Sequence, residues 1–149
     1  MKRFQILFLL CLALSFTFSI FAQDTKEVII LQTSDVHSRI EPINQKGDLY
    51  YNKGGFVRRA AFLEEFRKDH KNVLLFDCGD ISQGTPYYNM FRGEVEIKLM
   101  NEMGYDAMTI GNHEFDFDVD NMARIFKMAD FPVVCANYNL DAMVLKDIV

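Results

Sequence analysis

Three short apolar runs, each followed at once by polar residues of the kind that bind metal ions, constrain this chain more than any other feature. The run at 107–110 leads into the segment Gly-Asn-His-Glu-Phe-Asp at 111–116. Two earlier runs lead into Asp35-Val36-His37 and into Gly79-Asp80. Parallel strands of an α/β sheet bring their carboxyl ends to one edge, where such proteins build their sites. The three runs therefore predict a sheet whose strand ends share one site.

The segments between these runs have the periodicity of amphipathic helices. Strands are expected at 27–32, 73–76, 107–110 and 132–136, and helices at 56–70, from Thr85-Pro86 onward, at 94–103, and from Asp118 or Asp120 to about 129. In the first of these helices, apolar residues recur every three or four positions and are expected to face the core: Phe56, Val57, Ala60, Ala61, Leu63 and Phe66. This alternation of strands and helices is typical of an α/β fold with a largely parallel sheet.

The N-terminus has the pattern of a secretory signal peptide. Residues 1–22 start with two basic residues and continue as an almost unbroken apolar run that ends at Ala22, a plausible cleavage residue. We therefore expect an exported protein, periplasmic or extracellular, with residues 23–149 as one domain and no stable membrane span after cleavage. The alternative, an uncleaved anchor, is less consistent with the three hydroxyl residues that dilute the run.

Charge and cysteine content narrow the classes of function. The chain has 16 Lys and Arg against 21 Asp and Glu, and residues 1–22 contain two of the former and none of the latter, so the remainder has a net charge of −7. This balance argues against a nucleic-acid groove, and a phosphate substrate would need bound cations.

Cys78 and Cys135 are expected in strands, either as two buried thiols, the favoured interpretation, or as a disulfide.

The polar clusters contain the ligand types of a transition-metal site. Asp35 and His37 are two positions apart, and in extended chain such residues point the same way, so both could reach one ion. The carboxylate of Asp80 could bridge two ions, and Asn112 offers a neutral oxygen. Mixed oxygen and nitrogen ligands suit zinc, manganese or iron better than calcium. Two such ions can hold a phosphoryl group and activate water.

The segment after the third run adds a potential catalytic pair. His113 stands next to a ligand, and Asp116 follows three residues later, so the carboxylate could orient the imidazole for proton donation to a phosphate ester. Taken singly, each of these residues is more often a turn or helix-cap residue. Only the three clusters together favour metal-dependent chemistry.

Asp35-Val36-His37, Gly79-Asp80 and Gly111-Asn112-His113-Glu114 together resemble the first three blocks of the calcineurin-like metallophosphoesterases, and 33–38 and 111–116 resemble the signatures of the secreted 5′-nucleotidases. The resemblance implies the N-terminal half of a four-layer α-β-β-α sandwich that hydrolyses nucleotide phosphate esters, as 5′-nucleotidases and UDP-sugar hydrolases do, with two divalent ions, zinc, manganese or cobalt. It also implies roles for six residues: metal ligands Asp35, His37, Asp80 (bridging) and Asn112, catalytic His113, and its partner Asp116.

One departure from the family's pattern limits these expectations. Members complete their metal sites with later histidines, including a Gly-His-x-His block, whereas this sequence has no histidine after His113. We therefore expect residues 23–149 to be a truncated catalytic domain with an incomplete second metal site and little or no turnover. The alternatives are a non-catalytic exported module that binds metal or nucleotide, and an inactive fragment.

Overall fold

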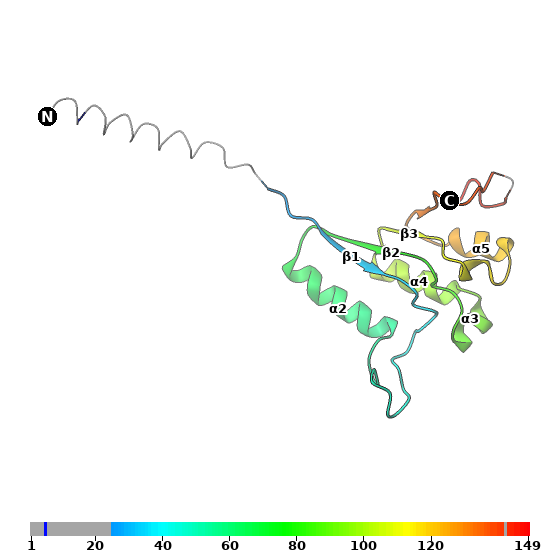
Figure 1. The fold of residues 1–149 in the computed structure, drawn as a ribbon, viewed down its shortest axis with the longest axis horizontal. Helices are drawn as coiled ribbons and strands as arrows, with labels where there is room; N and C mark the ends of the chain where they lie inside the picture. The colour runs from blue at the N-terminus through cyan, green and yellow to red at the C-terminus, as the bar shows by residue number, and fades with distance from the viewer. Residues whose placement is uncertain (1–4, 6–24, 142) are drawn as a thin grey trace.

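The chain folds as alternating strands and helices (Figure 1). The computed structural model describes residue 5, residues 25–141 and residues 143–149, so the expected signal peptide lies, apart from residue 5, outside the described residues. In chain order the elements are β1 (Ile29–Thr33), α2 (Phe56–Asp69), β2 (Val73–Asp77), α3 (Pro86–Phe91), α4 (Glu94–Met103), β3 (Ala107–Thr109), the 3-10 helix η2 (His113–Phe115), α5 (Val119–Phe126) and β4 (Val133–Val134). Within the described ranges, no helix is long and apolar enough to cross a membrane.

The four strands form one parallel sheet in the order β1-β2-β3-β4. Each crossover moves one strand in the same direction, and right-handed crossovers then place all the helices on the same face. The helices accordingly form one layer, in which α4 packs against α2, α3 and α5. A parallel sheet with one helix layer confirms the α/β fold and is the arrangement expected of half of a four-layer sandwich.

The two faces of the sheet differ in burial. Leu75, Met108 and Val133 face the helix layer and are at most 4% exposed. Residues on the opposite face are also apolar but exposed, namely Ile30 at 63%, Leu74 at 37% and Val134 at 51%. Ile30 lies directly beside Leu74 in the parallel register, so these two side chains adjoin. We call the face that bears Ile30, Leu74 and Val134 the open sheet face.

The prediction of which α2 residues face the core is only partly correct. Phe56 and Leu63 are buried, whereas Val57 is 70% exposed and Ala60 is also exposed. Val57 and Ala60 line a groove between α2 and α4 instead of entering the core. The apolar periodicity of α2 therefore covers a wider arc of the helix than the neighbouring elements bury.

Helix α5 begins as the sequence indicates. The carboxylate of Asp118 accepts a hydrogen bond of 2.6 Å from the Asn121 N–H, so Asp118, not Asp120, is the cap. Met122 and Phe126 are buried as expected, but the helix ends at Phe126 and not near residue 129, because the chain turns there toward β4.

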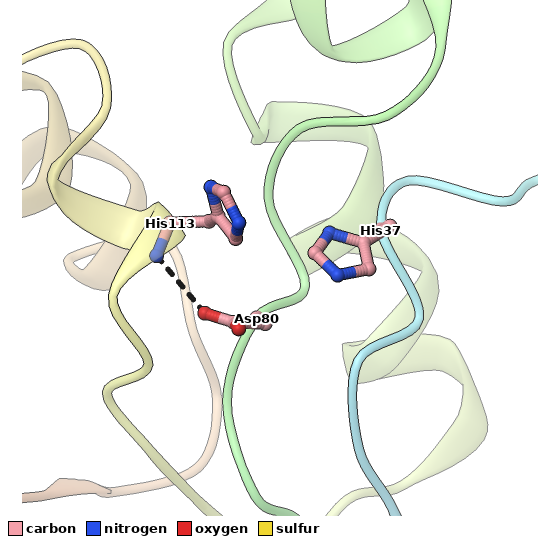
Figure 2. Close-up of side chains that lie close together, drawn as sticks. All are labelled: His37, Asp80 and His113. Atoms are coloured by element: carbon pink, nitrogen blue, oxygen red, sulfur yellow. Dashed lines mark hydrogen bonds between the residues drawn. The ribbon is translucent and has the colours of Figure 1, made fainter.

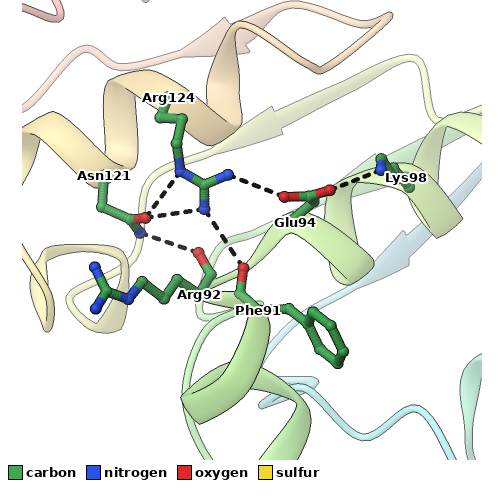
Figure 3. A network of polar contacts seen from close by, with 6 residues as sticks. All are labelled: Phe91, Arg92, Glu94, Lys98, Asn121 and Arg124. Carbon is green, nitrogen blue, oxygen red and sulfur yellow. Dashed lines mark hydrogen bonds and ion pairs between the residues drawn. The ribbon is translucent and has the colours of Figure 1, made fainter.

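Polar contacts join α5 to the corner between α3 and α4 (Figure 3). Arg124 donates to Glu94 at 3.1 Å and to the Asn121 side-chain oxygen, while the Asn121 amide donates to the Arg92 carbonyl at 3.0 Å. The Arg124–Glu94 pair is exposed, so it contributes little to stability.

The cysteines differ from the expectation of two buried thiols in strands. Both are free; Cys78 is exposed and Cys135 is half-buried. β2 ends at Asp77, whose side chain is buried under the helix layer, so the next residue projects from the other side of the sheet. Cys135 follows the two-residue strand β4.

Candidate metal centre

The loops after β1 and β2 run side by side. The Asp35 N–H donates to the Gly79 carbonyl at 3.0 Å, and the His37 N–H donates to the Asp80 carbonyl at 3.1 Å. These bonds extend the pairing of the two strands beyond their ends, where the sheet itself has stopped. They bring His37 beside Asp80, as the sequence predicts.

The backbone reaches this arrangement differently from the expectation. Asp35, His37 and Asp80 have φ values of 53°, 44° and 57°, in the left-handed region. The segment 35–37 is therefore not extended, and the reason given above for Asp35 and His37 pointing the same way is wrong. Non-glycine residues adopt this conformation infrequently, and a cluster of them at strand ends is typical of functional sites.

The loops after β2 and β3 are in direct backbone contact. A Cβ on Gly79 would lie 2.5 Å from the Gly111 nitrogen, and a Cβ on Gly111 would lie 2.1 Å from Asp80 Oδ1. Only glycine fits at either position. Across this contact the His113 N–H donates to Asp80 Oδ1 at 2.9 Å (Figure 2).

The three loops bring together His37, Asp80 and His113, whose potential ligand atoms all lie within 4.8 Å of one another (Figure 2). The two imidazole rings meet edge to face with centroids 5.0 Å apart. Two atoms bound to one tetrahedral zinc ion at about 2.0–2.2 Å lie about 3.3–3.6 Å apart. The group would therefore need shifts of about an ångström to close on one ion, and its nitrogen and oxygen donors suit a transition metal.

The tautomer of His37 is also that of a metal ligand. Its Nδ1 lies 3.1 Å from the Ser82 carbonyl oxygen. A carbonyl oxygen can only accept, so Nδ1 carries the hydrogen and Nε2 keeps a free lone pair. Metal-binding histidines commonly donate their second nitrogen to a carbonyl or carboxylate in this way.

His113 is oriented by Asp116, as expected. Its Nδ1 lies 2.8 Å from Asp116 Oδ2, and both side chains are about one-third exposed, at 30% and 33%. The hydrogen bond to Asp116 raises the pKa of His113 above its ordinary value. The surrounding carboxylates act in the same direction, while partial burial opposes them. Nε2 is then the nitrogen available to the site.

The other two expected ligands, Asp35 and Asn112, are both exposed. Asp35 is exposed and accepts a hydrogen bond from the Ser34 hydroxyl, and among the described residues it is not part of the group formed by His37, Asp80 and His113. Asn112 is exposed at the start of η2, immediately before His113. The structure thus gathers His37, Asp80 and His113, with Asp116 bonded to His113.

Two buried acids near the site have no assigned role in the sequence interpretation. Glu114 is 1% exposed and accepts hydrogen bonds from three backbone N–H groups. The signal in the sequence is its position three residues after Gly111, a spacing at which a carboxylate can reach back to a backbone N–H.

Asp77 is the second such acid. It is 2% exposed at the end of β2, and it accepts hydrogen bonds from the Thr33 hydroxyl and the Gly79 N–H. Burial raises its pKa from 3.8 to about 6, although both hydrogen bonds oppose this change. The Thr33 hydroxyl also lies 2.8 Å from the Tyr105 hydroxyl, so a buried polar network underlies the strand ends.

The parallel sheet, the three loops at its carboxyl edge and the His-Asp-His group define a metal-dependent phosphoesterase fold. The chain belongs to the calcineurin-like phosphoesterase family, whose family model matches residues 28–147.

Relatives that the chain resembles within the family include 5′-nucleotidases. A snake venom 5′-nucleotidase from Gloydius brevicauda is 42% identical over 118 residues, which are 74% of this chain and 20% of the relative. A 5′-nucleotidase precursor from Thermus thermophilus superimposes with a TM-score of 0.73 at 35% identity, over 81% of this chain and 24% of that one. The NAD nucleotidase of Haemophilus influenzae has a TM-score of 0.69 at 33% identity, over 79% and 22%. The chain thus spans about a fifth of the length of the curated relatives it matches.

Proposed function

We propose that this chain supplies the first ligands and the catalytic histidine of an enzyme that hydrolyses nucleotide phosphate esters. The observation that carries the proposal is the convergence of His37, Asp80 and His113. The Nδ1 atoms of both histidines are hydrogen-bonded, one to the Ser82 carbonyl and the other to the Asp116 carboxylate. The relatives named as 5′-nucleotidases and as an NAD nucleotidase support a nucleotide as substrate.

The proposed ligand set follows the strand ends. Asp35 and His37 would hold a first divalent ion, Asp80 would bridge to a second, and Asn112 would bind the second. When bound, two such ions supply a water molecule of lowered pKa and neutralise charge on the phosphoryl group. Zinc, manganese and cobalt all accept these ligands.

His113 is proposed as a proton donor to the ester, although it also lies close enough to the other two residues to act as a ligand. Asp116 holds its ring in one orientation and raises its pKa, so the imidazolium persists to higher pH than in an ordinary histidine. A positioned imidazolium can protonate the leaving oxygen as the ester bond breaks.

We also propose that residues 23–149 are only part of a catalytic domain, with a second metal site that these residues do not complete. The match to only about a fifth of the length of the curated relatives and the apolar open sheet face support this. The purified chain is then expected to bind metal but to release little phosphate from AMP. Rapid turnover by the chain alone, lost in Asp80→Ala, would contradict this part of the proposal.

A chimera tests the function directly. Residues 27–149 would replace the matching quarter of the Thermus thermophilus 5′-nucleotidase. We expect AMP hydrolysis in the chimera, a decrease of about 10²–10⁴-fold in His113→Ala, and unchanged metal content in that variant. If the His113→Ala chimera loses its metal, His113 is a metal ligand instead of a proton donor. A folded chimera that binds metal without any hydrolysis would favour the alternative of a non-catalytic binding module.

We propose, finally, that the protein is exported. The basic start and apolar run of residues 1–22 support this, as does the similarity to a venom enzyme. N-terminal sequencing of the protein secreted or released from the producing cell should find a first residue at or near Gln23. An intact Met1 in a protein retained inside the cell would contradict it.

A further inference from the structure

The buried carboxylate of Glu114 connects the two loops that deliver the candidate ligands. Glu114 lies in η2, next to His113, but its side chain points away from solvent and is 1% exposed. Its Oε2 accepts from the Asp80 N–H at 3.0 Å and from the Gly111 N–H at 2.6 Å. Its Oε1 accepts from the Ser82 N–H at 3.1 Å.

One of these contacts holds Asp80, the proposed bridging ligand. Asp80 has a left-handed backbone with φ of 57°, a strained conformation that needs support from its surroundings. Glu114 holds the backbone N–H of Asp80, and the N–H of His113 holds its carboxylate at 2.9 Å. Asp80 is therefore fixed at both its backbone and its side chain by one three-residue segment.

The Glu114 carboxylate is also linked to His37 indirectly, through the backbone of Ser82. It holds the N–H of Ser82, and the carbonyl of Ser82 accepts the hydrogen bond that fixes the His37 ring. One buried acid thus links the positions of His37, Asp80 and His113, which come from three different loops.

We propose that Glu114 is a positioning residue of the metal centre, which sets the separation of the three ligand-bearing loops through its three backbone hydrogen bonds. The inference rests on the proposed metal centre. It assigns to Glu114 neither a ligand role nor contact with substrate.

Cobalt binding tests the proposal, because the visible spectrum of bound Co²⁺ reports coordination geometry. In Glu114→Gln the amide keeps an acceptor oxygen but presents an N–H₂ group to at least one of the three donors. In Glu114→Asp the charge is retained but the side chain is one carbon shorter. We expect Co²⁺ affinity to fall about 10–100-fold in both variants, with an altered spectrum, as for outer residues of other metal sites. Glu102→Gln, which removes an exposed charge on α4, should leave both unchanged.

The outcomes separate the possible failures. Folded Glu114 variants with normal affinity and spectrum but a lower thermal midpoint would overturn the inference, because Glu114 would then only stabilise the fold. Absence of Co²⁺ binding by the unchanged protein would overturn the metal centre and this inference with it.

Hydrogen exchange in the unchanged protein provides a reading that does not depend on a folded variant. The amides of Asp80, Ser82 and Gly111 should exchange slowly and at similar rates, and Co²⁺ should slow all three further. Three unrelated rates, or no response to Co²⁺, would count against the inference.

Discussion

At the scale of single residues, four carboxylates lie in different surroundings at the strand ends. Asp80 is half-buried and lies within 4.8 Å of a ring nitrogen of each histidine, Asp116 is partly exposed and bonded to one of them, and Asp77 and Glu114 are buried beneath the site. Burial, not residue type, distinguishes Asp80, the proposed ligand, from Asp77, the acid beneath it.

Asp77 provides a pH-dependent test of this network. Because its pKa is raised from 3.8 to about 6, the folded protein binds more protons than the unfolded chain between about pH 4 and pH 6. The free energy of unfolding should therefore fall as pH rises through that window and level off above it, with a full effect of about 3 kcal/mol. Asp77→Asn, which cannot titrate, should remove this slope in urea unfolding from pH 4 to pH 7.

The control for this measurement is Asp130→Asn, which changes an exposed acid after α5. Its slope should match that of the unchanged protein. If Asp77→Asn also keeps the slope, another group accounts for it and the buried network is not as described.

At the scale of elements, the loops after β2 and β3 depend on glycine in a way that a matched pair can isolate. Gly79 and Gly47 both have φ of 93°, but a Cβ on Gly79 meets the Gly111 backbone, whereas nothing lies within 4 Å of a Cβ on Gly47. Both changes to alanine carry the left-handed strain of about 1–2 kcal/mol. Only Gly79→Ala adds a clash, which we expect to cost about 1–3 kcal/mol more in denaturant unfolding. Equal costs would show that the two loops can separate freely.

Elements with strong local signals were predictable from sequence. Four strands, the helix starts at Pro86 and after Asp118, and the end of α4 at Gly104 follow from periodicity, caps and stop residues. The turn at 35–37 was not predictable, since it depends on hydrogen bonds to the loop at 79–81, about 44 positions away. The inward direction of Glu114 depends likewise on donors from a distant loop.

The six site residues were identified from spacing and resemblance, and the structure brings His37, Asp80 and His113 together. His37, Asp80 and His113 converge because backbone contacts between the three loops position them. The orientation of an exposed side chain such as Asp35 is not fixed by local sequence. Its proposed ligand role therefore stays a prediction.

At the scale of the whole molecule, the open sheet face should behave as surface. Ile30→Ala with Leu74→Ala should change the free energy of unfolding by no more than about 1 kcal/mol, because both side chains are exposed. The same pair should reduce binding of a hydrophobic dye and self-association, since it removes part of the apolar surface.

The matched control on the other face is Leu75→Ala, which lies between sheet and helices and is 1% exposed. It should cost about 2–5 kcal/mol. A similar cost for the Ile30 and Leu74 pair would show that this face is covered in solution.

A titration of the full chain with Co²⁺, compared with Asp80→Asn, tests the metal centre most directly. Asparagine keeps the shape and the acceptor for the His113 N–H but loses the charged ligand at the centre of the group. We predict that the unchanged chain binds Co²⁺ at these strand ends through Asp80 and that Asp80→Asn weakens binding by more than about 10–100-fold, the loss expected for outer residues. No binding by the unchanged chain, or equal binding by Asp80→Asn, would contradict the presence of a metal centre at these strand ends.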